Sequence, residues 1–238
     1  INARAEAVTE NNFPSGAGIA SSASAFAALA LAGSKAAGLE LNERELSRLA
    51  RRGSGSASRS VPAGFVEWQA GESDDDSFAF SIAPPNHWDL VDLVAIVSTA
   101  HKKTGSTEGH AIAPTSPLQA ARVEDAPRRL DLCRQAILNK DFNAFASIVE
   151  LDSDMMHAVM MTSTPALQYW KPASLAVMEA VRMWRADGLP ACYTMDAGAN
   201  THVLTLESEA QGIEKKLRGI DGVENILIAR PGGAAKIA

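Results

Sequence analysis

The sequence of 238 residues contains few cysteines, few aromatic residues and no cluster of basic residues. Its two cysteines, Cys133 and Cys192, are too few for a disulfide framework and have no metal-binding spacing. Scattered Lys and Arg and a formal net charge of -6 argue against a nucleic-acid surface, because binding to phosphate backbones needs clustered cations. These features favour a protein of a reducing, cytoplasmic compartment that does not bind nucleic acid.

Long apolar runs are also missing, so we expect neither a membrane span nor a charged-then-apolar leader. The longest candidate, residues 90–100, has the length of a strand and contains Asp92. A composition of 46% hydrophobic and 21% charged residues is typical of a globular chain with one large core or two small ones. The chain opens at Ile1 without a methionine, and its first residues are typical of a strand entering a loop, so we expect a fragment of a longer protein.

The order of predicted elements indicates an α+β fold rather than a doubly wound one, because helices and strands do not alternate strictly. Asn42 and Glu45 have the spacing of a capping box, and Ser208 and Gln211 repeat it near the end of the chain. The Ser/Gly-rich residues 51–60 are predicted to form a polar loop outside the core, and residues 72–76 a solvated acidic turn. Helices are expected over residues 24–37, 42–53, 115–184 and 208–220, and strands over 64–71, 89–100, 190–198, 201–207 and 223–233.

The stretch "NNFPSGAGIASSAS" places Gly16 and Gly18 just before Ser21 and Ser22, where a helix is predicted to begin. A glycine-rich turn points backbone N–H groups at an anion, and the helix N-terminus adds the positive end of its dipole. In the alternative interpretation, the glycines form a tight turn and Ser21 is an N-cap. The spacing matches neither a Walker loop nor a Rossmann fingerprint.

Three further loops carry polar residues suited to an anionic ligand. "GSGSASR" offers the hydroxyls of Ser54, Ser56 and Ser58 with the planar cation of Arg59. "KKTGST" offers Lys102, Lys103, Ser106 and Thr107 at the end of a predicted strand. "YTMDAGAN" sets Asp196 after another strand, beside small residues. Each loop alone could be a solvated turn or a helix cap; together they predict a site for a phosphate-bearing ligand with a carboxylate nearby.

These motifs carry a family resemblance. "NNFPSGAGIASSAS" resembles the P-x-x-x-G-L-x-S-S-A motif of the GHMP kinase superfamily, and with "ARRGSGSASRSVPAGFVEW", "KKTGST", "DSDMMHA" and "YTMDAGAN" the chain resembles the mevalonate diphosphate decarboxylase family. The resemblance implies an incomplete ribosomal-protein-S5-like N-terminal lobe in residues 1–85 and a ferredoxin-like lobe in 86–238. It implies a homodimeric enzyme that uses ATP and Mg²⁺ to phosphorylate the C3 hydroxyl of a mevalonate 5-phosphate or 5-diphosphate. Loss of phosphate and CO₂ then gives an isopentenyl phosphate or diphosphate for isoprenoid biosynthesis.

The resemblance also implies roles for particular residues. Asp196 matches the catalytic aspartate at the C3 hydroxyl, Arg59 the arginine that holds the substrate carboxylate, and Ser22 the motif serine near the ATP phosphates. No metal-ligating side chain is implied. The remaining cofactor-binding residues are Gly16, Gly18, Ser21, Ser54, Ser56 and Ser106, of which the last three also match substrate-binding positions.

The sequence leaves two other functions open, a GHMP kinase that stops after phosphorylation and a non-catalytic relative or inactive fragment. The family's N-terminal substrate-binding segment would lie before Ile1, and His110 stands where methionine is common in the family. His157 follows Asp154 by nearly one helical turn, so the two could pair, and Asp152 could cap a helix. The methionines of residues 155–161 are expected to pack in the core.

Overall fold

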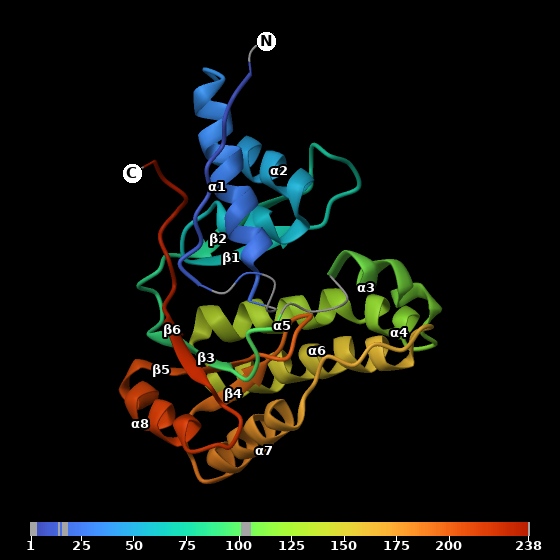
Figure 1. Ribbon diagram of the computed structural model, residues 1–238, viewed down its shortest axis with the longest axis vertical. Helices are drawn as coiled ribbons and strands as arrows, with labels where there is room; N and C mark the ends of the chain where they lie inside the picture. Colours follow the sequence, from blue (N-terminus) through green and yellow to red (C-terminus); the bar gives the residue numbers. More distant parts are fainter. Residues whose placement is uncertain (1–3, 14, 16–18, 101–105, 238) are drawn as a thin grey trace. The chain divides into compact units, whose positions relative to one another are not determined.

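A computed structural model describes residues 4–13, 15, 19–100 and 106–237 (Figure 1). The chain divides into two compact units. The first unit contains residues 20–87 together with the C-terminal segment from Pro231, and the second unit contains Trp88–Arg230. The assignment of residues 1–85 and 86–238 to the two lobes stays a prediction.

The first unit combines two helices, a 3₁₀-helix and an antiparallel strand pair. Small and aliphatic side chains from the helices and from the turn after them form its core, namely Ala27, Leu46, Ala50, Ala57 and Val61. The predicted helices and first strand are confirmed, whereas the second strand was not predicted. The elements are α1 (Ser21–Ala36), α2 (Glu43–Gly53), η1 (Gly55–Ser60), β1 (Phe65–Gln69) and β2 (Phe78–Ala83).

The start of α2 has the predicted capping box. The Asn42 side chain accepts a hydrogen bond from the Glu45 N–H at 3.0 Å, and a Glu45 carboxylate oxygen accepts one from the Asn42 N–H at 2.9 Å. Two donors at the helix N-terminus are thereby satisfied by side chains only three residues apart. Local sequence therefore determines where α2 begins.

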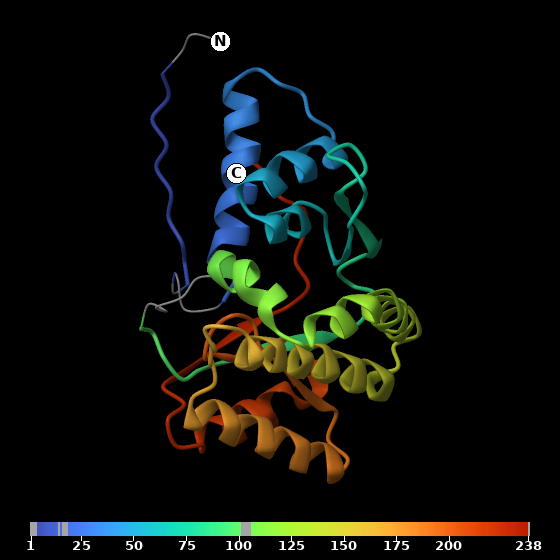
Figure 2. The same cartoon turned by 90° about the vertical axis from the view of Figure 1, so that its right-hand side faces the viewer.

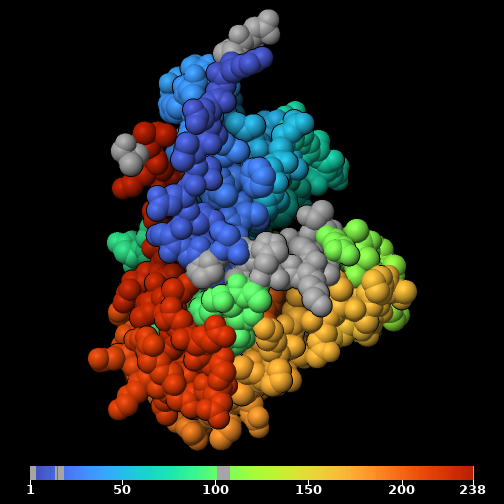
Figure 3. Space-filling model, in the orientation of Figure 1, coloured from blue at the N-terminus to red at the C-terminus, as the bar shows by residue number. Residues whose placement is uncertain are grey.

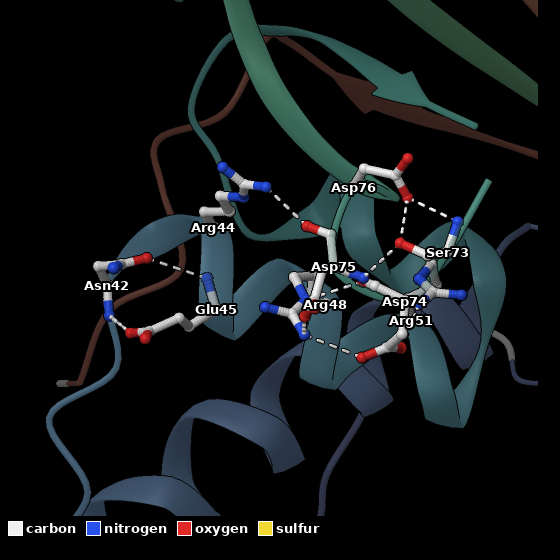
Figure 4. Close-up of polar contacts among 9 residues, drawn as sticks. All are labelled: Asn42, Arg44, Glu45, Arg48, Arg51, Ser73, Asp74, Asp75 and Asp76. Carbon is white, nitrogen blue, oxygen red and sulfur yellow. Dashed lines mark hydrogen bonds and ion pairs between the residues drawn. The ribbon is translucent and has the colours of Figure 1, made fainter. Parts of the chain in front are cut away.

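The acidic turn before β2 is bound by α2 rather than simply solvated (Figure 4). Arg48 and Arg51 both form ion pairs with Asp74, at 3.0 and 2.5 Å. Asp76 closes the turn by accepting hydrogen bonds from the N–H groups of Glu72 and Ser73, and these bonds lower the pKa of its carboxyl to about 2. Arginines spaced along one face of α2 thus hold the turn that leads into β2.

The prediction that residues 51–60 lie outside the core was wrong for Ala57 and Ser58. Residues 55–60 form η1, and Ala57 and Ser58 within it are fully buried. The Ser58 hydroxyl donates to the Gly55 carbonyl at 2.8 Å, and the Ser47 hydroxyl of α2 donates to the Ser58 carbonyl at 3.1 Å. A serine-rich segment packs inside because its hydroxyls find partners on the nearby backbone.

The second unit contains a four-stranded antiparallel sheet with strand order β4-β5-β3-β6. Helices α7 and α8 pack on one face of this sheet (Figures 1 and 2), where Val181 and Leu217 meet Leu93 and Val203 in the core. The strands are β3 (Leu90–Ile96), β4 (Ala191–Thr194), β5 (Thr201–Leu206) and β6 (Asn225–Ala229), and the longer helices are α5 (Ala126–Asn139), α6 (Phe142–Thr162), α7 (Pro172–Ala186) and α8 (Glu207–Arg218).

The two edges of the sheet differ. β6, with α8 beside it, lies at the surface of the second unit (Figure 3), and Arg230, the residue after β6, forms an ion pair with Glu207, the first residue of α8. β4, at the other edge, is fully buried over Ala191–Tyr193 and is covered by α6 and α7. The buried edge of the sheet is the one that leads into Asp196.

Two helix predictions need correction. The predicted helical region 115–184 divides into α4 (Gln119–Glu124), α5, α6 and α7, with a non-helical segment at residues 163–171. The capping box predicted at Ser208 is wrong, because β5 ends at Leu206, α8 begins at Glu207, and no side chain caps the helix. Shorter pieces, η2 (Ala113–Thr115) and α3 (Ser106–Ile112), precede α4.

Chain segments distant in sequence meet again after β6. The C-terminal segment returns to the first unit, where the Gly64 N–H donates to the Gly232 carbonyl at 2.8 Å and the Ala235 N–H to the Val61 carbonyl at 2.9 Å.

Helix α6 is 21 residues long, but carboxylate side chains lie within its sequence. No helix in the described part of the chain is long and apolar enough to span a membrane.

Candidate functional site

In the first unit, the predicted phosphate-binding residues lie around the N-terminus of α1. The helix follows Ala20, which is in the left-handed region with φ 52° and ψ 32°. The N-cap position is Ala20, without a side-chain cap among the described residues, and no acidic residue lies in the first turn, so the alternative that Ser21 is the N-cap is wrong. The helix dipole at this end is therefore not offset by a local carboxylate. Gly16 and Gly18 lie outside the described residues.

Three of the predicted serines lie together although 32 residues separate the first from the second. The Ser22 hydroxyl in α1 lies 3.3 Å from that of Ser54, which lies 3.4 Å from that of Ser56. Ser54 is the C-cap residue of α2 and directly precedes η1, which contains Ser56. The junction between α2 and η1 therefore places the hydroxyls of Ser54 and Ser56 near the start of α1. The arrangement offers exchangeable hydrogen-bond donors to an anion beside a helix N-terminus.

Arg59 lies near the end of η1, and its side chain is exposed. Its guanidinium lies 5.7 Å from the centre of the Trp68 ring. The indole N–H of Trp68 donates to the Ser77 hydroxyl at 3.1 Å, which orients the ring beneath the cation. The Trp68 ring thus restricts the orientation of the Arg59 guanidinium, a planar cation suited to binding a carboxylate or a phosphate.

In the second unit, Asp196 is exposed on the loop that follows β4. The loop turns back on itself, because the Gly198 N–H donates to the Asp196 carbonyl at 2.8 Å. The Ser174 hydroxyl at the start of α7 donates to the Ala199 carbonyl at 2.6 Å. The carboxylate is therefore accessible on a backbone held from more than one side.

Asn200 ties the end of this loop to the end of β3. Its side-chain oxygen accepts hydrogen bonds from the N–H groups of Val97 at 2.9 Å and Ser98 at 3.1 Å, and its amide donates to the Ser98 carbonyl at 3.1 Å. The side chain is 1% exposed, so these bonds are made out of water. A buried amide that is hydrogen-bonded through both its oxygen and its nitrogen rigidifies the loop it belongs to.

Helix α6 supplies the polar partners for the edge of β4. The Glu150 carboxylate forms a two-point ion pair with Arg185, at 2.5 and 2.7 Å, and accepts a hydrogen bond from the Tyr193 N–H at 3.2 Å. One turn on, Asp154 accepts hydrogen bonds from the Tyr193 hydroxyl and from Arg182. Burial raises the pKa of the Asp154 carboxyl, and these two partners offset part of that effect.

The alternative that His157 pairs with Asp154 is therefore wrong, because Arg182 and Tyr193 occupy that carboxylate. His157 instead donates from Nε2 to the Met195 carbonyl at 3.3 Å. Its side chain is 1% exposed, and burial lowers its pKa to about 4, although the Met195 carbonyl and the Asp196 charge act in the opposite direction. Asp152, the third carboxylate discussed in α6, does not cap the helix but forms an ion pair with Arg129 at 2.9 Å.

A cavity of about 150 Å³ lies in the second unit beside the loop that carries Asp196. The Tyr169 hydroxyl is buried there and has no hydrogen-bond partner among the described residues. Met160 packs in the core with Val159, and both also border the cavity, whereas Met161 is exposed, so the expectation that these methionines pack in the core is confirmed for Met160 and wrong for Met161. Its wall is formed by Gly109, His110, Ala113, Gln119, Arg122, Met156, Val159, Met160, Tyr169 and Ala197.

Other predicted groups are less completely placed. Ser106 begins α3, but its side chain lies outside what the structure describes. Within the described residues no three His, Cys, Asp or Glu side chains are grouped so that they could hold a metal ion. Cys192 is buried in β4, and burial raises the pKa of its thiol.

Sequence reasoning missed the residues that hold the Asp196 loop. Ser153 and His157 have the i, i+4 spacing of one helix face, but their common partner is Met195, 38 or more residues away. Asn200 belongs to the quoted "DAGAN" motif, yet nothing in its local sequence indicates that it binds residues 97 and 98. Spacing could indicate a shared face, but not what that face contacts.

The fold and these loops can be compared with known proteins. A sequence model described as the mevalonate 5-diphosphate decarboxylase C-terminal domain matches residues 92–224, and one described as the diphosphomevalonate decarboxylase-like N-terminal domain matches residues 1–79. The diphosphomevalonate decarboxylase of Aspergillus fumigatus is 41% identical over 222 residues, covering 90% of this chain and 55% of the relative. The human diphosphomevalonate decarboxylase is 39% identical over 214 residues, covering 87% of this chain and 53% of the relative.

Solved structures give the same result. A complex of MDDEF with MVAPP, AMPPCP and magnesium matches at a TM-score of 0.85 and 37% identity, over 93% of this chain and 68% of that one. The α+β architecture is thus that of the GHMP kinase fold. Together with the sequence models, it shows that the chain belongs to the mevalonate 5-diphosphate decarboxylase family, as its motifs predicted. The chain spans about half the length of the curated relatives it matches.

Proposed function

We propose that the protein carrying this chain catalyses the ATP-dependent decarboxylation of mevalonate 5-diphosphate or mevalonate 5-phosphate. The C3 hydroxyl is phosphorylated, and loss of phosphate and CO₂ then gives isopentenyl diphosphate or phosphate for isoprenoid biosynthesis. The observation that carries the proposal is Asp196, an exposed carboxylate on a loop whose backbone is bound by α6, α7 and, through Asn200, the end of β3. Membership of the decarboxylase family supports it.

Asp196 has the chemistry that the first step needs. A tertiary hydroxyl is a crowded and weak nucleophile, so its orientation matters more than the strength of the base that takes its proton. Asp196 would accept a hydrogen bond from this hydroxyl and then its proton. When the phosphate leaves, positive character develops at C3, and the same negative charge would stabilise it.

The first unit offers groups for the anionic parts of the ligands. Arg59 would bind the substrate carboxylate through its planar guanidinium. The hydroxyls of Ser22, Ser54 and Ser56 and the uncapped first turn of α1 fit a phosphate group, because they provide donors and a positive dipole without a local carboxylate. Gly16, Gly18, Ser21 and Ser106 complete the proposed phosphate-binding set.

The proposed cofactors are ATP and Mg²⁺. ATP supplies the phosphoryl group, and Mg²⁺ balances the charge of its phosphates. Serine hydroxyls are oxygen ligands of the kind that Mg²⁺ accepts together with phosphate oxygens and water, so the residues around Ser22 fit such a site without a protein carboxylate cage. AMPPCP and magnesium in the solved MDDEF complex support this choice.

We further propose that the protein is a cytoplasmic homodimer that binds small molecules rather than nucleic acid or membranes. The family resemblance and the net charge of -6 support this proposal. Light scattering after size-exclusion chromatography should give twice the monomer mass, and cell fractionation should recover the protein with cytoplasmic markers. A monomer mass or recovery with membranes would contradict these parts.

The experiment measures ATP consumption and CO₂ release together, using the complete gene product and both mevalonate phosphates. We expect CO₂ in a one-to-one ratio with ADP for one of the two substrates. ADP without CO₂ would instead support a kinase that stops after phosphorylation, and no turnover with either substrate would support a non-catalytic relative.

The role of Asp196 is tested by Asp196→Asn, which keeps the size of the side chain but removes its charge. We expect turnover to fall by about 10³–10⁴-fold with nucleotide binding retained. The matched control is Asp221→Asn, at an exposed turn position of the same unit. Near-normal turnover of Asp196→Asn would contradict the assignment.

A further inference from the structure

The residue before Asp196 is bound by α6 through both its backbone N–H and its backbone carbonyl. The Met195 N–H donates to the Ser153 hydroxyl at 3.0 Å, and the Met195 carbonyl accepts from His157 Nε2 at 3.3 Å. Ser153 and His157 are four residues apart in α6 and therefore lie on one face of the helix. Both backbone groups of a single residue are thus attached to one rigid element.

The His157 ring itself has little freedom. A carbonyl only accepts hydrogen bonds, so Nε2 carries the proton and the tautomer is determined by Met195. The ring lies 5.0 Å from Trp170 and 5.9 Å from Tyr169, measured between ring centres. These aromatic residues belong to the non-helical segment between α6 and α7, so this segment as well as α6 restricts the position of His157.

His157 is poorly placed to exchange protons with a ligand. Its side chain is 1% exposed, and its low pKa keeps it neutral at physiological pH. Asp196, the next residue after the bound Met195, is in contrast exposed. The histidine therefore contacts the backbone that carries the carboxylate, while the carboxylate faces solvent.

We propose that Ser153 and His157 are positioning residues for Asp196, which they orient toward the reacting hydroxyl by fixing the backbone N–H and carbonyl of Met195. This inference rests on the proposed function, because it takes Asp196 as the group at that hydroxyl. If either partner is lost, a buried backbone group loses its hydrogen bond, and the loop shifts to find another. A shift of about 1 Å at a catalytic group lowers turnover by about 10²-fold.

The test compares four variants of the complete gene product. His157→Leu removes the donor but keeps an apolar side chain, whereas His157→Gln keeps an amide N–H near the position of Nε2. Ser153→Ala removes the other partner. Ser163→Ala is the matched control, because its hydroxyl is also buried at the end of α6 but bonds Met160 and Pro165, away from Met195.

We expect His157→Leu and Ser153→Ala to lower kcat by about 10–100-fold while KM for ATP changes by less than about threefold. His157→Gln should recover most of the loss, and Ser163→Ala should retain kcat within about twofold even where its Tm falls equally. Unchanged kcat in His157→Leu, or no recovery in His157→Gln, would overturn the proposal. If His157→Leu does not fold, Ser153→Ala and His157→Gln decide the question.

Hydrogen exchange of residues 195–199, measured without ligand, separates this proposal from the proposed function. Exchange should rise in His157→Leu and Ser153→Ala but not in Ser163→Ala. Absence of decarboxylation by the unmodified protein would refute the function, whereas unchanged exchange in both His157→Leu and Ser153→Ala would refute the positioning role.

Discussion

Acidification should destabilise the second unit through His157 before this histidine takes up a proton in the folded state. The imidazole is 1% exposed, and burial lowers its pKa from 6.5 to about 4. In the unfolded chain it takes up a proton near pH 6.5. Between these two values the unfolded state binds more protons than the folded state, so the free energy of unfolding must decrease as the pH falls.

The size of this effect follows from the two pKa values. The contribution of His157 is complete above about pH 6.5 and is lost as the pH falls toward 4, where the total loss is about 3 kcal/mol. At pH 5 the expected loss is about 2 kcal/mol. This is a substantial part of the stability of an ordinary domain, which is about 5–15 kcal/mol.

Two measurements check this prediction. NMR titration of the imidazole C–H signals should place His157 near pH 4, whereas His202 should titrate above its ordinary pKa, because Asp92 outweighs the effect of burial there. Urea unfolding at pH 7.5 and pH 5 should show a loss about 2 kcal/mol larger in the unmodified protein than in His157→Gln, which does not titrate. Titration of His157 near pH 6.5, or equal losses in the two proteins, would refute the reasoning.

Three further predictions concern stability and are checked by urea unfolding. Asn200→Ala removes three hydrogen bonds at the end of β3 and should cost about 3 kcal/mol, with the exposed Asn86→Ala as control; a cost below about 1 kcal/mol would show that water replaces the amide. Gly64→Ala should lower the free energy of unfolding by at least about 2 kcal/mol, because φ is +74° and a Cβ would lie 2.3 Å from the Ala83 carbonyl oxygen. Gly33→Ala in α1 should be neutral or stabilising, because a Cβ there would have no atom within 4 Å. Equal effects of the two substitutions would contradict this account. Glu150→Ala leaves Arg185 and the Tyr193 N–H without their shared partner and should lower the free energy of unfolding by about 3–5 kcal/mol. The control Glu179→Ala, at an exposed position, should be nearly neutral. A small cost for Glu150→Ala would mean that solvent reaches this pair.

Local chemistry in the sequence was sufficient for several parts of the fold. The capping box of Asn42 and Glu45 predicted the start of α2, and the Val- and Ile-rich residues 89–100 predicted β3. Both features depend on groups a few residues apart, so no distant contact is needed to form them. Where a distant contact intervened, prediction failed: Ser208 was expected to cap α8, but the helix already begins at Glu207, whose N–H donates to the Asp89 carbonyl at 2.9 Å, just before β3.

The candidate site divides in the same way. Residue type and order alone indicated Ser22, Ser54, Ser56, Arg59 and Asp196 and the family to which the chain belongs, because motif chemistry is local. Only the tertiary structure decided that three serine hydroxyls meet at the start of α1 and that the Asp196 loop is bound through Met195 and Asn200. The partners of that loop come from α6, α7 and β3, and buried backbone groups must find hydrogen bonds wherever the fold brings them. Sequence thus determined which side chains carry the proposed chemistry, and packing determined how the backbone that presents them is held.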